Sequence, residues 1–117
     1  MNGNVIKEKS FRFAVRIVIL CKYLKTEKRE YILSKQLMRS GTSIGANVRE
    51  SQNAESKADF IHKLAIAQKE ADETLFWLEL LKETDYITAE EFRSLESDAS
   101  ELLKLIRSII LTTKKNK

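Results

Sequence analysis

The stretch that decides the fold is TAEEFRSLESDASELLKLIRSI, residues 88–109. Its apolar side chains recur at alternating steps of three and four, the heptad pattern of a helix with one buried seam: Phe92, Leu95, Ala99, Leu102, Ile106 and Ile109. Thr88 and Glu91 have the spacing of a capping box, in which each side chain accepts a hydrogen bond from the other residue's backbone amide. Ile87 and Phe92 flank the pair as a hydrophobic staple. The stretch therefore predicts a helix over residues 89–113.

Three further apolar periods predict helices over residues 4–25, 30–52 and 57–84. The chain has no proline and three glycines, a composition that favours long helices. Ser56 precedes Asp59 by three residues and predicts the start of the third helix. Short connections make neighbouring helices antiparallel. We therefore predict one all-α domain over residues 1–117, an antiparallel up-down-up-down four-helix bundle.

Two glycines, Gly41 and Gly45, interrupt an otherwise helical period in the second segment. A glycine weakens a helix by about 1 kcal/mol relative to alanine, so propensity alone favours a break there. The apolar period nevertheless continues from Leu37 through Ile44 to Val48. We predict a continuous helix whose glycines form a groove for close approach of another backbone. We also expect Asn47, near this groove, to be a buried hydrogen-bonding residue that sets helix register.

The first helix has a second apolar set besides its core stripe. Phe11, Val15 and Val18 lie about 150° around the helix from that stripe by the 3.6-residue period. A lone bundle would leave them in water. We therefore expect this set to be the interface of a homo-oligomer.

Basic residues exceed acidic residues by 21 to 17, and the excess is uneven along the chain. Residues 1–25 hold six basic side chains and one acidic one, whereas residues 57–86 hold four and seven. Clustered cations bind phosphates without any base-reading motif. The candidate residues for a nucleic-acid surface are Lys9, Arg12, Arg16, Lys22, Lys25, Arg39 and Arg49. The alternative is a solvated face whose charges pair with neighbouring helices.

Residues suited to enzyme chemistry are few. His62 is the single histidine, so the two Glu-x-x-His pairs of a di-iron bundle cannot form. Two carboxylate pairs, Glu70 with Glu73 and Asp98 with Glu101, have a spacing that binds Mg²⁺ in all-helical nucleotide pyrophosphatases. This is the enzymatic alternative, although the same spacing is common on solvated helices. We expect no enzyme, no catalytic residues, no metal site and no cofactor.

The middle of the chain resembles a known family. The motif is RSGTSIGANVRE at residues 39–50, followed by Ala54-Glu55-Ser56, Asp59-Phe60, Lys69-Glu70 and WLELL at residues 77–81. This pattern is similar to that of the four-helix-bundle proteins encoded within intervening sequences of bacterial 23S ribosomal RNA genes. Many members have a proline in the first connection, where this chain has Thr26-Glu27-Lys28.

The resemblance implies an antiparallel four-helix bundle that assembles as a ring-shaped homopentamer. The accessory variability determinant proteins of diversity-generating retroelements look like relatives, and those bind nucleic acid and a reverse transcriptase through a basic surface. We therefore expect a cytoplasmic homo-oligomer that binds RNA, DNA or a nucleic-acid enzyme. It would have no membrane partner and no small-molecule substrate. A protein-only oligomeric adaptor is the alternative, and a Mg²⁺-dependent hydrolase is the third possibility.

Overall fold

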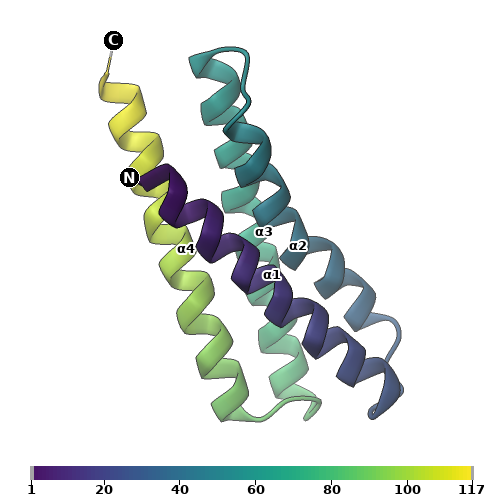
Figure 1. The fold of residues 1–117 in the computed structure, drawn as a ribbon. Helices are drawn as coiled ribbons and strands as arrows, with labels where there is room; N and C mark the ends of the chain where they lie inside the picture. The colour runs from purple at the N-terminus through teal and green to yellow at the C-terminus, as the bar shows by residue number, and fades with distance from the viewer. Residues whose placement is uncertain (1, 117) are drawn as a thin grey trace.

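The computed structural model describes residues 2–116, and the side chains of residues 5–116. Its elements are α1 (Asn2–Thr26), α2 (Leu33–Ser51), α3 (Lys57–Glu83) and α4 (Ala89–Lys115). Figure 1 shows the four helices running alternately down and up, so the chain is an all-α antiparallel four-helix bundle as predicted. Met1 and Lys117, which the predicted domain includes, lie outside the described residues. Between residues 2 and 116 no helix is long and apolar enough to cross a membrane.

The apolar stripes predicted for the helices form the core. On α4, the side chains of Leu95, Ala99 and Ile106 are buried, and Ile109 packs against them from a half-buried position. The capping box is present, because the Thr88 hydroxyl accepts from the Glu91 amide at 3.0 Å and Glu91 accepts from the Thr88 amide at 2.8 Å. Ser56 likewise caps α3 by accepting from the amide of Asp59 at 3.0 Å. Local patterns therefore place the starts of both C-terminal helices correctly.

The start of α2 differs from the prediction. The helix begins at Leu33 rather than at residue 30, and the residue at its N-cap position is Ile32. The buried Glu30 carboxylate accepts hydrogen bonds from the amides of Ile32, Leu33 and Ser34 at 3.1, 2.9 and 2.7 Å. The preceding Arg29 has a positive φ of 53°, which turns the chain so that the carboxylate can reach these amides. One side chain thus satisfies three free donors at the helix start.

The two glycines of α2 lie against α1, and the helix is continuous through both. A β-carbon on Gly41 would meet the side chain of Ile17, and one on Gly45 would lie 3.2 Å from the carbonyl oxygen of Ser10. The backbones of α1 and α2 therefore approach closely along this line. Asn47 is half-buried and donates hydrogen bonds to the carbonyl and hydroxyl of Ser43 at 2.9 and 3.1 Å. These two bonds stay within α2 and do not link it to another helix, so a role of Asn47 in setting helix register stays a prediction.

The ring of helices is closed least completely between α1 and α4. Packing is close between α1 and α2, between α2 and α3, and between α3 and α4, and it is sparsest between α4 and α1. In Figure 1 the start of α1 lies beside α4, and the two helices diverge toward the end of α1. This divergence leaves an open seam on one side of the bundle.

Candidate functional site

Three of the seven cations predicted to bind phosphates form ion pairs with carboxylates at or near the seam between α1 and α4. Lys9 of α1 pairs with Glu101 of α4 at 3.2 Å, and Arg16 pairs with Asp98 of α4 at 2.7 Å. Arg12 pairs with Glu8 one turn earlier on α1. Each pair is well exposed, so each contributes at most about 1 kcal/mol to stability. Their positive charge is largely compensated, as the alternative of a solvated, paired face predicts.

Arg39 is compensated in the same way at another interface. Its guanidinium on α2 pairs with Glu70 of α3 at 3.3 Å and also with Glu73. The indole of Trp77 donates a hydrogen bond to the Glu73 carboxylate at 2.9 Å. Arg39 therefore ties α2 to α3 and is a poor candidate for phosphate binding.

The same ion pairs bear on the hydrolase alternative. Glu70 and Glu73 face Arg39 between α2 and α3, whereas Asp98 and Glu101 face Arg16 and Lys9 between α4 and α1. The two carboxylate pairs thus lie in different interfaces and do not converge on one site. Among the described side chains, no group of three or more His, Cys, Asp or Glu residues is arranged to hold a metal ion.

Of the seven candidate cations, three have no carboxylate partner in the described part of the chain, namely Lys22, Lys25 and Arg49, and Lys7 of α1 has none either. Lys22 and Lys25 are exposed near the end of α1, and Arg49 is exposed in the last turn of α2. Lys7 is not among the predicted residues. The sequence does not show that Glu8 pairs with Arg12 and that Lys7 is left without a partner. These four side chains are cations of α1 and α2 that remain available to an anionic partner.

The outer side of α1 carries a row of exposed apolar side chains. Phe11 and Val15 are 55% and 42% exposed, as predicted, whereas Val18 is half-buried. The row continues at steps of four through Ile19, which is 61% exposed, and Tyr23. The predicted interface does not include Ile19 or Tyr23, although the four-residue spacing that begins at Phe11 and Val15 predicts both of them. Because the row steps by four and the helix repeats every 3.6 residues, it drifts around α1.

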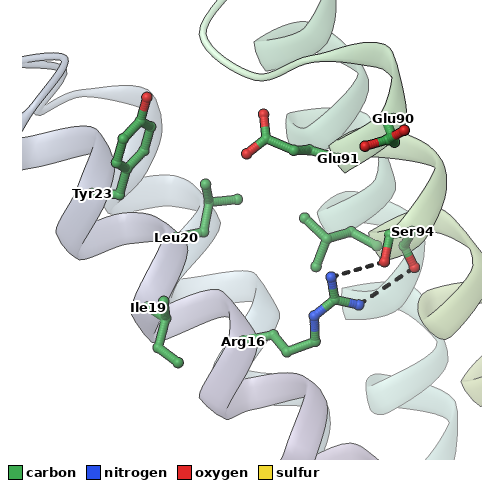
Figure 2. A pocket seen from close by; sticks show the side chains of 8 residues that line it. Arg16, Ile19, Leu20, Tyr23, Glu90, Glu91 and Ser94 are labelled. Carbon is green, nitrogen blue, oxygen red and sulfur yellow. Dashed lines mark hydrogen bonds between the residues drawn. The ribbon is translucent and has the colours of Figure 1, made fainter.

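One end of this row lies in the seam between α1 and α4. A groove of about 650 Å³ opens there, lined by Arg16, Ile19, Leu20, Tyr23, Glu90, Glu91, Ser94 and Leu95. Figure 2 shows Arg16 reaching across from α1 to Ser94, with Glu91 extending from α4 toward the α1 side of the gap. The Arg16 guanidinium donates to the Ser94 hydroxyl at 2.9 Å. The groove is mainly apolar on its α1 wall and acidic on its α4 rim.

The other end of the row lies toward α2. A second groove of about 380 Å³ is lined by Lys7, Phe11, Ala14, Thr42, Gly45, Ala46, Arg49 and Glu50. The Arg49 guanidinium lies over the Phe11 ring, 5.9 Å from its centroid. Ala14, Thr42, Gly45 and Ala46 contribute small side chains to the walls, and α1 and α2 approach closely at Gly45. The two grooves therefore flank α1 on opposite sides and differ in chemistry.

Comparison with known proteins identifies the family. The model of the family described as 23S rRNA-intervening sequence protein matches residues 3–108. The chain belongs to this family. The family predicted from the motif at residues 39–50 is therefore confirmed.

A solved structure is similar to this 23S rRNA-intervening sequence family member along nearly its whole length. It is the 1.70 Å crystal structure of a protein with unknown function from the S23 ribosomal protein family of Bacteroides thetaiotaomicron VPI-5482. The two chains are 58% identical and superpose with a TM-score of 0.93, covering 94% of this chain and 98% of that one. No curated protein matches the family member described here.

Proposed function

We propose that this protein is a non-enzymatic, self-assembling scaffold that binds RNA or DNA through cations on α1 and α2. The observation that carries the proposal is the outer face of α1. It combines an exposed apolar row with three lysines, Lys7, Lys22 and Lys25, that have no carboxylate partner among residues 5–116. The apolar row is suited to a protein partner, and the cations are suited to phosphates.

The groove between α1 and α4 supports self-association. Ile19 is 61% exposed at its edge, and the walls include the apolar side chains of Leu20 and Tyr23. A second copy of the chain that covered this surface would gain about 25 cal/mol of favourable free energy for each Å² of apolar area buried. A head-to-tail contact of this kind closes into a ring when its rotation permits. A pentamer is the assembly that the family resemblance implies.

Ring symmetry would strengthen weak phosphate binding. Lys7, Lys22, Lys25 and Arg49 of a single chain attract a phosphate backbone only modestly, but each is repeated in every copy around the symmetry axis. Phosphate contacts release counterions, so binding by such a surface falls steeply with salt concentration. The proposal therefore requires both assembly and salt-sensitive binding.

The test combines solution mass with nucleic-acid binding. Sedimentation should give a multiple of the 13.5 kDa chain mass, with five copies as the first expectation. Labelled RNA and DNA should be retained at about 50 mM salt, and affinity should drop by orders of magnitude near 200 mM. Replacing Lys22 and Lys25 by Gln should flatten the salt dependence, while the already paired Arg39→Gln should leave it nearly unchanged. A monomer that retains neither nucleic acid would refute the proposal.

A protein-only adaptor is the second candidate, favoured by the acidic rim of the same groove. Glu90 and Glu91 stand at the start of α4 beside the apolar wall of α1. A partner helix with apolar and basic residues would fit that combination. An assembled protein that binds no nucleic acid at low salt would support this candidate over the first.

A further inference from the structure

The groove between α1 and α2 combines an exposed aromatic ring with unneutralised positive charge. Phe11 is 55% exposed, and the guanidinium of Arg49 lies 5.9 Å from its ring centroid. Arg49 and Lys7 have no carboxylate partner in the described part of the chain. An aromatic face beside cations is the combination that stacks a nucleobase and binds its phosphates.

The acidic residues near this groove do not cancel its charge. Glu50 lines the groove and pairs with Lys63 of α3 at 3.1 Å. The Glu50 carboxylate accepts a hydrogen bond from the Lys63 ammonium, which raises the pKa of Lys63. Glu8 lies beside Phe11 and pairs with Arg12. The net charge offered to a ligand is thus positive.

The shape of the groove suits a flat ligand. Ala14, Gly45 and Ala46 contribute almost no side-chain bulk beside the Phe11 ring, and the groove volume is about 380 Å³. This volume is at the small end of the usual range for ligand sites, about 300–1,000 Å³. It has room for one base, with the ring of Phe11 as one wall.

The cations continue along the same side of α1. Lys22 stands eleven residues after Phe11, which places it close to the same line about 16 Å farther along the helix. Lys25 stands five helical turns after Lys7. A strand held at Phe11 therefore has further phosphate partners in one direction, whereas a free nucleotide would use only the groove.

We propose that this groove holds one unpaired nucleotide of a single-stranded nucleic acid, with its base stacked on Phe11 and its phosphates bound by Arg49 and Lys7. The inference rests on the proposed nucleic-acid binding and narrows it to single strands. It also assigns Phe11 to ligand binding, leaving Ile19 and Tyr23 for contact between copies. A base paired within a duplex is stacked between its neighbours and cannot enter the groove.

The experiment compares Phe11→Leu with Phe76→Leu in the full chain. Phe76 on α3 is 56% exposed and serves as a matched control far from the groove residues in sequence. Binding of a fluorescein-labelled oligo-uridine of about twelve nucleotides and of a duplex of equal length is measured by fluorescence anisotropy at low salt. Loss of one stacked base should weaken single-strand binding by about ten-fold or more for Phe11→Leu. Duplex binding and the Phe76→Leu variant should be unaffected.

A second measurement locates the base directly. Photo-crosslinking of the same oligomer containing 5-bromouridine should give an adduct at Phe11 or an adjacent residue of α1. Adducts that map only elsewhere would overturn the inference. So would a Phe11→Leu protein with a lower mass by sedimentation, because Phe11 would then belong to the contact between copies.

The outcomes separate this inference from the function on which it depends. Equal, salt-sensitive binding of single strands and duplexes, unchanged by Phe11→Leu, would leave nucleic-acid binding intact and remove the stacking site. Absence of all binding would remove both. Uridine monophosphate that binds as tightly as the oligomer would identify a free nucleotide as the occupant and overturn the proposal of a strand.

Discussion

A β-carbon built on Gly41 of α2 would lie 2.8 Å from both Cγ1 and Cγ2 of Ile17 on α1. Ile17 is completely buried, so its side chain has little room to move away. Two helices that approach this closely need a residue without a side chain at the crossing. Gly41 therefore serves packing, and its low helix propensity is tolerated for that reason.

Replacing Gly41 by Ala should destabilise the protein. Overpacking costs about 1–3 kcal/mol, which exceeds the gain of about 1 kcal/mol from better helix propensity. Urea denaturation measures the difference in the free energy of unfolding. The double variant with Ile17→Ala should lose less stability than the sum of the losses in the two single variants, because Ile17→Ala removes the atoms that clash with the added β-carbon. A neutral or stabilising Gly41→Ala would show that Ile17 can move away from the added methyl group.

Glu30→Ala should lower stability by about 1–2 kcal/mol. The change leaves the amides of Ile32, Leu33 and Ser34 without their carboxylate acceptor. Glu30→Gln keeps one oxygen acceptor and should cost less. The control is Glu27→Ala, an exposed position in the same connection. The measurement is the urea denaturation midpoint of each of the three variants, which should be lowest for Glu30→Ala. Equal midpoints for Glu30→Ala and Glu27→Ala would contradict the capping role.

Helix starts illustrate what the sequence can predict. Thr88 with Glu91 and Ser56 with Asp59 are local spacings, so the starts of α4 and α3 follow from residues three apart. The Glu30 cap was missed because it depends on the positive φ of Arg29, a conformation that arginine rarely adopts. The first connection is therefore where the predicted boundary is wrong by three residues.

The candidate site was harder to predict because pairing is a tertiary property. The sequence shows that Lys9, Arg16 and Arg39 are basic, but it does not show that carboxylates of α3 and α4 lie opposite them. Likewise, Arg49 and Phe11 are far apart in the chain and meet only because α1 and α2 cross closely. Apolar periodicity identified one buried face per helix and part of the exposed row on α1.

Ile19→Glu should dissociate the assembly while leaving the fold intact. The side chain is 61% exposed in the single chain, so a carboxylate there is solvated in the monomer and unfavourable only at an apolar contact. Sedimentation velocity measures the mass, and circular dichroism checks the helices. Leu111→Glu is the control, since Leu111 is equally exposed but lies near the end of α4. An unchanged mass for Ile19→Glu would place the interface elsewhere.

The Cys21 thiol should make stability fall at high pH. Burial raises the pKa of Cys21 from about 9 to about 11, and the thiol donates to the Ser34 carbonyl at 3.3 Å. Between these two values the unfolded thiol loses its proton while the folded one keeps it, so unfolding is favoured as pH rises. Below about pH 9 the thiol is protonated in both states and contributes no pH dependence.

The measurement is urea denaturation of the natural chain and of Cys21→Ala across pH 8 to 11. The variant removes this one contribution and keeps the lysines and tyrosines that titrate in the same range. The natural chain should therefore lose stability more steeply than Cys21→Ala above about pH 9. Parallel curves would show that the thiol is as acidic in the folded protein as in the unfolded one.

The incomplete closure between α1 and α4 has a consequence for motion. Packing is sparsest at this junction, and the exposed pairs of Arg16 with Asp98 and of Lys9 with Glu101 bridge it. Dissolved ions screen such pairs while leaving apolar packing intact. Backbone amide protons in the last turns of α1 should therefore exchange with solvent deuterium sooner than those of α3, and added sodium chloride should widen that difference. Access of solvent to the junction of α1 and α4 would then depend on the ionic strength of the solution.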